Sequence, residues 1–276
     1  MKKTMPSVWC ADVIVPVDPC AEAAGPASGD FWDAGTATVR LAGAGNEVVM
    51  FQMVVEGRPR DIGGLRFEGL KPLRAEVFQN VAIPIKDRWY DDALVPLDLC
   101  DAAGSIRAIT AQALPVTGRQ RQTFTVEIYI PKDSRAGEYA FSIAVRVAGV
   151  DHRLNVCLRV HAFDLPNEPA CTADINNYSR SPGEGFEGAL DDPARYLKIE
   201  RAYFREARRH RAMFHLLPYT HAGRLEPGFA PDLAGRGNSR HVKDWRPFDR
   251  HWGACLDGSA YRGIHGGWTW PVEYLY

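Results

Sequence analysis

The stretch Arg121–Ile130, RQTFTVEIYI, decides the fold class of this chain, because its apolar side chains recur at every second position. Two further runs with the same period follow, and the turn-rich segment Pro131–Gly137 and a turn at Gly149 separate the three runs. The expected inward-facing positions are Phe124, Val126, Ile128 and Ile130; Phe141, Ile143, Val145 and Val147; and Leu154, Val156, Leu158 and Val160. In the first run, the expected outward-facing positions are Thr125, Glu127 and Tyr129. Three consecutive half-buried strands predict an antiparallel meander.

The residues before this stretch also have the pattern of strands. Glu47–Val55 is apolar on both faces except at Gln52, which is typical of a central strand covered on each side. Shorter candidate strands lie at Val8–Val15, Thr36–Leu41, Leu65–Leu70 and Ala75–Ile83. Many short strands separated by Gly and Pro turns indicate two packed antiparallel sheets. We therefore expect residues 1–168 to form an N-terminal β-sandwich domain.

The pattern changes after Phe163–Pro169, where two prolines within four residues interrupt any strand. Cys171–Tyr178 is a candidate strand, and Met213–Tyr219 is another. A helix between them is expected to begin with Asp191 or Asp192 as N-cap and Pro193 in its first turn, and to continue to about Arg211. Its expected buried stripe is Tyr196, Ile199, Tyr203, Ala207 and His210, with Arg201, Arg205, Arg208 and Arg209 on the solvated surface. This order of elements predicts a βαβ unit.

A βαβ unit normally belongs to a parallel sheet or to an α/β barrel. Only about 110 residues follow residue 168, whereas a (β/α)8 barrel needs about 250. The chain stops in the apolar, aromatic run Trp270–Tyr276, which has the pattern of a strand. We therefore expect residues 169–276 to be the incomplete start of a barrel, and the chain to be an N-terminal fragment. The predicted fold class is mainly β, then α/β, with a truncated (β/α)8 barrel.

Composition excludes several classes of protein. With 46% hydrophobic residues and a net charge of -1, from 33 Lys+Arg against 34 Asp+Glu, the chain is neither disordered nor strongly attracted to polyanions. We therefore expect no nucleic-acid and no membrane partner, and we interpret the arginines at 201–211 as a solvated helix face.

Pro6, Asp12 and Pro16 interrupt every apolar run near the start, so the chain as written is expected to be cytoplasmic, unless a natural start upstream carries a signal. The six cysteines show no C-x-x-C pair and are expected to be reduced.

An ordered set of motifs resembles glycoside hydrolase family 123 and its uncharacterised relatives. These motifs are Gly45–Gln52, similar to the family's NE…FQ strand; Asp87–Pro96, similar to a family loop; Ile130–Tyr139, similar to its hairpin start; Phe163–Pro166, similar to its domain junction; and Arg209–Arg211, Phe248–Gly253 and Leu256–Tyr261. The resemblance implies a β-sandwich followed by a (β/α)8 barrel. It also implies retaining exo-β-N-acetylhexosaminidase activity with an N-acetylgalactosaminide substrate, in which the substrate's acetamide is the nucleophile, an Asp orients it and an adjacent Glu is the general acid/base. This sequence contains no Asp-Glu dipeptide, so no catalytic residue is assigned and the fragment is expected to be inactive.

Candidate sugar contacts follow from the predicted barrel, because active sites of such barrels lie at the carboxyl ends of the strands. Asn176 and Tyr178 end the first predicted strand, and Tyr219 ends the second. Trp245 and Asp249 lie in the long connection Ala222–Arg262. Amides, carboxylates and aromatic rings suit a glycan or amino-sugar substrate. The alternatives are local turn bonding for the asparagine and an Asp–Arg pair that holds the connection together.

No cofactor and no metal are expected. His221, His241, His251 and His265 are spaced too widely for a short ligand motif, and the chain has neither a Gly-rich phosphate loop after a strand nor a G-x-S-x-G elbow. A second functional hypothesis is a non-catalytic carbohydrate-binding or scaffold β-sandwich protein. The oligomeric state is not predicted.

Overall fold

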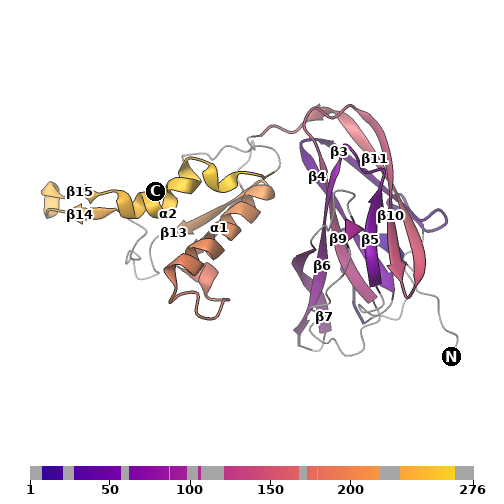
Figure 1. The fold of residues 1–276 in the computed structure, drawn as a ribbon, viewed down its shortest axis with the longest axis horizontal. Coiled ribbons are helices and arrows are strands. Elements are labelled where there is room, and N and C mark those ends of the chain that lie inside the picture. The colour runs from indigo at the N-terminus through magenta and orange to yellow at the C-terminus, as the bar shows by residue number, and fades with distance from the viewer. Residues whose placement is uncertain are drawn as a thin grey trace. The chain divides into compact units, whose positions relative to one another are not determined.

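The computed structural model describes residues 8–20, 28–56, 62–86, 88–97, 105–106, 121–167, 173–178, 180–217 and 231–264. The chain divides into two compact units, Met1–Leu165 and Pro166–Tyr276. The first unit is built from strands, and the second contains both helices and strands (Figure 1).

One sheet of the first unit has five strands in the order β1-β4-β9-β6-β7, and all neighbours are antiparallel. Its strands are β1 (Val8–Ala11), β4 (Glu47–Glu56), β6 (Arg74–Ile85), β7 (Arg88–Leu97) and β9 (Arg121–Ile130). Because β4 lies between β1 and β9, the prediction of a central strand at Glu47–Val55 is confirmed. The sequence resemblance placed a loop at Asp87–Pro96, whereas the structure has the edge strand β7 there.

The other sheet has six strands in the order β2-β3-β11-β10-β5-β8. Its strands are β2 (Trp32–Asp33), β3 (Thr38–Gly45), β5 (Ile62–Glu68), β8 (Ser105–Ile106), β10 (Gly137–Val147) and β11 (Val150–Asp164). All neighbours are antiparallel except β3 and β11, which are parallel. Figure 1 shows the two sheets as facing layers, so the unit has the character of a β-sandwich.

The predicted three-strand meander is wrong. β10 and β11 do form a hairpin, but β9 pairs with β4 and β6 in the opposite sheet. The connections explain the difference. Ala148 and Gly149 both have positive φ, which suits the two-residue turn of a tight hairpin, whereas residues 131–136 give the chain enough length to cross between the sheets.

The core between the sheets contains the apolar positions expected from the alternating pattern. Side chains from both sheets pack together, including Phe124 and Ile128 of β9, Ile143 of β10 and Leu158 of β11. However, β9 is not half-buried as expected, because all ten of its residues are buried. Thr125 on its second face donates a hydrogen bond to the Asn80 side chain at 2.9 Å, so a buried polar layer lies on that face.

Three segments that carry the sequence resemblance meet at one corner of the sandwich. Asn46, in the left-handed region at φ 63°, donates from its side chain to the Leu165 carbonyl at 2.8 Å. The Asp133 backbone N–H donates to the Asp164 carboxylate at 3.2 Å. A Cβ at Gly45 would collide with that same carboxylate, so a larger residue there would displace the Asp164 side chain. These motif residues therefore tie the last residues of the sandwich to two of its turns.

In the second unit, β12 (Ala173–Tyr178) and β13 (Ala212–Leu217) pair in parallel, and α1 (Pro193–Arg209) connects them. The Asp192 carboxylate accepts from the backbone N–H groups of Ala194 at 3.0 Å and Arg195 at 3.1 Å, so the predicted helix start is confirmed with Asp192 as the cap. A βαβ unit is present, but the described residues do not show a barrel.

The remaining elements of this unit follow β13 in the sequence, except for one 3-10 helix that lies between β12 and α1. They are the antiparallel hairpin of β14 (Asp232–Ala234) and β15 (His241–Asp244), the helix α2 (Arg246–Leu256), and the short 3-10 helices η2 (Ser181–Gly183), η3 (Gly237–Ser239) and η4 (Ser259–Tyr261). The hairpin extends from the start of α2 (Figure 1).

The buried face of α1 differs from the predicted stripe. Tyr196 and Ala207 are buried as expected, but Tyr203 and His210 are exposed. Glu200, Phe204 and Arg208 are buried in addition, although the arginine was expected on the solvated surface. The apolar contacts explain this orientation, because Phe204 packs edge-on against Phe214 of β13 at 5.3 Å between ring centroids.

Candidate functional site

The carboxyl edge of β12 and β13 is the site expected from the sequence. The parallel register pairs Asn176 with His215 and Tyr178 with Leu217, so both strands end at the same edge of this small sheet. For β12 the structure describes the backbone, which places Asn176 and Tyr178 in the last three residues of the strand. Tyr219 lies outside the described residues. The backbone thus has the arrangement in which α/β proteins place ligands, outside the carboxyl ends of parallel strands.

Trp245 and Asp249 lie one helical turn apart at the start of α2. The Asp249 backbone N–H donates to the Trp245 carbonyl at 2.9 Å. The indole ring of Trp245 is 55% exposed and packs edge-on against Phe248, with 5.6 Å between ring centroids. Asp249 is exposed in the first turn, where a carboxylate complements the helix dipole. The described contacts of these two residues are with their neighbours in α2 and do not join them to β12.

A buried acid–base pair between α1 and α2 was not found by sequence reasoning. His251 Nε2 lies 2.7 Å from Glu200 Oε2, and the two side chains are 13% and 2% exposed. The Tyr196 hydroxyl donates to Glu200 Oε1 at 3.1 Å. From the sequence, His251 was considered as one of four histidines too widely spaced for a metal motif, and Glu200 was not considered. The i, i+4 spacing of Tyr196 and Glu200 beside the apolar stripe is the signal that would have found the pair.

The surroundings of this pair favour a structural role. Phe204 packs edge-on against Trp252 at 5.9 Å, and the His251 ring contacts the same tryptophan at 4.6 Å. A buried contact between a carboxylate and an imidazole, enclosed by aromatic rings, holds two helices in one arrangement, but it presents no open position for a substrate. We therefore do not assign it to the site.

A second buried polar group links α1 to η4. Arg208 is almost fully buried, with its guanidinium 6.0 Å from the centre of the Tyr261 ring. Burial raises the pKa of the Cys255 thiol, and a hydrogen bond from the Tyr261 hydroxyl partly offsets this shift. Burial also raises the pKa of Tyr261. Cys255 is therefore a protonated, unreactive thiol at neutral pH, as expected for a structural cysteine.

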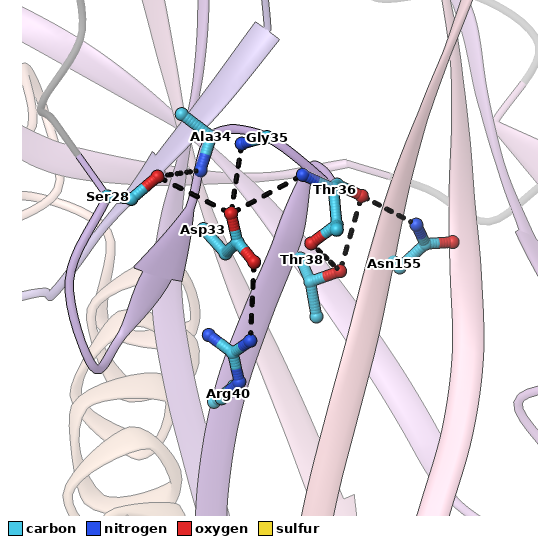
Figure 2. Close-up of polar contacts among 8 residues, drawn as sticks. All are labelled: Ser28, Asp33, Ala34, Gly35, Thr36, Thr38, Arg40 and Asn155. Atoms are coloured by element: carbon cyan, nitrogen blue, oxygen red, sulfur yellow. Dashed lines mark hydrogen bonds and ion pairs between the residues drawn. The ribbon is translucent and has the colours of Figure 1, made fainter.

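A dense polar group in the first unit is a turn and not a site (Figure 2). The Asp33 carboxylate accepts from the Gly35 backbone N–H at 2.9 Å, and Arg40 lies 3.4 Å away. Hydrogen bonds from Thr36 and Gly35 lower the pKa of Asp33. The Asn155 side chain donates to the Thr36 carbonyl at 2.9 Å, which joins this turn to β11. Each of these contacts orders the β2–β3 turn.

The described part of the chain shows neither a metal-binding group of side chains nor a membrane-spanning helix. No group of three or more His, Cys, Asp or Glu side chains there is arranged to hold a metal ion. No helix there is long and apolar enough to cross a membrane.

The chain is similar in fold to a family 123 glycoside hydrolase from Clostridium perfringens, a protein whose structure was analysed for glycolipid glycan hydrolysis. That likeness has a TM-score of 0.50 and 11% sequence identity, and it covers 93% of this chain and 46% of the other. The present chain thus spans about half the length of that enzyme. At this identity the likeness describes the fold.

Two other solved structures match with lower TM-scores. The C-terminal domain of the AgI/II polypeptide BspA from Streptococcus agalactiae matches with a TM-score of 0.29 and 15% identity, over 56% of this chain and 50% of that one. BcpA, the major pilin subunit of Bacillus cereus, matches with a TM-score of 0.30 and 9% identity, over 50% and 40%. Both TM-scores are too low to indicate a shared fold. No family model and no curated protein match the chain.

Proposed function

We propose that this chain is the sandwich and the first βαβ unit of a glycoside hydrolase-like protein whose substrate is a glycan containing an N-acetylhexosamine. The observation that carries the proposal is the likeness to the family 123 enzyme, because it covers 93% of the chain and so includes residues of both units. The ordered motifs at Gly45–Gln52 and Leu256–Tyr261 support it from the sequence.

In this proposal, β12, α1 and β13 are the first elements of a (β/α)8 barrel. The sugar contacts are Asn176, Tyr178 and Tyr219 at the carboxyl edge of the strands, with Trp245 and Asp249 at the rim. An amide both donates to and accepts from sugar hydroxyls, and an aromatic ring packs on the apolar face of a pyranose. The chain has no Asp-Glu dipeptide, so its own role is to bind and orient the sugar.

The test combines binding and hydrolysis. We expect N-acetylgalactosamine to bind the whole chain weakly in a calorimetric titration, and Asn176→Ala or Tyr178→Ala to weaken binding about tenfold or more, since each removes a direct contact. Tyr90→Ala is the matched control, because this half-exposed tyrosine lies on edge strand β7 of the other unit. An aryl N-acetylgalactosaminide should not be hydrolysed.

Hydrogen exchange of the whole chain with the sugar bound locates the contact. Protection confined to β12 and β13 is the expected result. Protection confined to the strands of the sandwich would replace the proposal with the carbohydrate-binding or scaffold alternative. Hydrolysis by the purified chain would show that it carries its own acid/base pair, against the assignment made here.

A further inference from the structure

One flank of α1 lines a groove of about 560 Å³ in the second unit. Its apolar lining is Ala194, Leu197 and Ala202, and its cationic lining is Lys198, Arg201 and Arg205. These positions recur every three or four residues, so they form one stripe along the helix. The stripe lies beside the face of α1 that packs on β13 and α2 and is separate from the carboxyl edge of the strands.

No carboxylate among the described residues forms an ion pair with the positive charges of this groove. Arg201 Nη2 donates to the Arg250 carbonyl at 3.4 Å, and Arg205 donates to the carbonyls of Ala260 and Arg262. Lys198 is exposed. Because carbonyl oxygens satisfy donors without cancelling charge, the groove keeps a positive potential.

The acidic residue on this flank of α1 has its described partners at the end of the helix. Glu206, the acidic residue of the same flank, is held by His210 at 3.0 Å and by Arg209 at 3.8 Å. Its carboxylate is therefore directed to the end of the helix and not to Lys198 or Arg201.

We propose that the α1 groove binds an acidic amphipathic helix of a partner protein. Lys198, Arg201 and Arg205 are spaced i, i+3 and i+7, over about 10 Å of helix, which matches carboxylates at the same spacing on a second helix. The apolar side chains of Ala194, Leu197 and Ala202 supply the contact surface for the partner's apolar stripe. A nucleic acid fits less well, because the chain as a whole has a net charge of -1 and so gives no long-range attraction to a continuous row of phosphates.

The test uses the whole chain and a fluorescein-labelled helical peptide with Glu at every third or fourth position and Leu between. We expect saturable binding by fluorescence anisotropy at low salt, and weaker binding as salt rises. Lys198→Glu and Arg201→Glu should each weaken binding about tenfold or more, because like charges then face the peptide. Arg236→Glu is the matched control, since this exposed arginine of the β14–β15 hairpin forms no ion pair with another described residue and should change binding less than about twofold.

Folding is checked separately by circular dichroism. Lys198 is fully on the surface and makes no described side-chain contact, so Lys198→Glu tests the groove even if Arg201→Glu disturbs the packing against α2. Absence of binding, equal binding of a peptide with Gln in place of Glu, or equal weakening by Arg236→Glu would each overturn the proposal. Tighter, Lys198-dependent binding of a duplex oligonucleotide would overturn it in favour of a nucleic-acid partner.

Discussion

The sandwich and the βαβ unit differ in what fills their interiors. Between the sheets, the first unit packs aliphatic and phenyl side chains such as Phe51, Ile143 and Leu158. The second unit has a smaller cluster of mainly aromatic side chains, and it buries Glu200 and Arg208 beside them. A large apolar interface stabilises a fold without charged partners, whereas a small one depends on each polar contact it encloses. We therefore expect substitutions of similar size to destabilise the two units through different interactions.

The largest effect is expected from a cavity in the sandwich. Phe124→Ala removes a fully buried ring from the interface between the sheets and should lower the free energy of unfolding by about 3–5 kcal/mol, measured by urea denaturation. Phe163→Ala, which truncates a ring that is 59% exposed in the same unit, should change it by less than about 0.5 kcal/mol. Similar losses for both variants would mean that the core is misassigned.

The corresponding change in the second unit removes the buried carboxylate that contacts His251. Glu200→Ala leaves His251 and the Tyr196 hydroxyl without their shared carboxylate, and it should destabilise this unit by about 3 kcal/mol. Hydrogen exchange should show the loss in α1 and α2 while strands β4 and β9 keep their protection. Glu206→Ala, an exposed carboxylate on the same helix, should cost less than about 1 kcal/mol. Equal effects of the two would show that the buried pair does not stabilise the unit.

A smaller effect is expected at the start of α1. Asp192→Ala removes the side-chain acceptor of two backbone N–H groups and should cost about 1 kcal/mol, measured as a shift of the thermal transition of the second unit. Asp191→Ala is the matched control one residue earlier and should change stability by less than about 0.5 kcal/mol. The opposite ranking would move the cap to Asp191.

The smallest effect on stability is expected at low pH, where two carboxylates with lowered pKa values become protonated. Hydrogen bonds from Arg246 lower the pKa of Asp244 to about 2 from 3.8, and bonds from Thr36 and Gly35 lower the pKa of Asp33. A lowered folded-state pKa contributes stability above the unfolded value, and this contribution is lost as pH falls from about 4 to about 2. Asp244→Asn should therefore lose less stability than the parent chain in that window. Carboxyl titration by NMR measures both pKa values, and ordinary values would contradict the described contacts.

The sequence alone predicts many local features of both units. The alternation in Phe141–Val147 and Leu154–Val160 predicts buried faces that the structure confirms, because side chains on a strand alternate between its two faces. The helix start near Asp192 and Pro193 is also predicted, since the cap acts through adjacent backbone groups. At the candidate site, the sequence predicts a βαβ unit, and in the structure β12, which carries Asn176 and Tyr178, pairs in parallel with β13.

Other features depend on contacts between residues far apart in the chain. Backbone hydrogen bonds are alike for every residue, so the alternation in β9 does not reveal that its partners are β4 and β6, or that β3 pairs in parallel with β11. The buried face of α1 was misassigned because Glu200 and Arg208 are polar in sequence and become interior only where His251 and Tyr261 meet them.

The amino-acid sequence alone therefore predicted the strands β4, β10 and β11 with their buried apolar positions, the start of α1 and the change from strands to a βαβ unit, but it did not predict β7 or α2. The predicted features follow from periodicity and from contacts within a few residues. The tertiary structure was needed to see which strands pair, which face of α1 is buried and which of its arginines is interior. Those outcomes depend on long-range packing, because a charged side chain is buried when a distant partner compensates its loss of hydration.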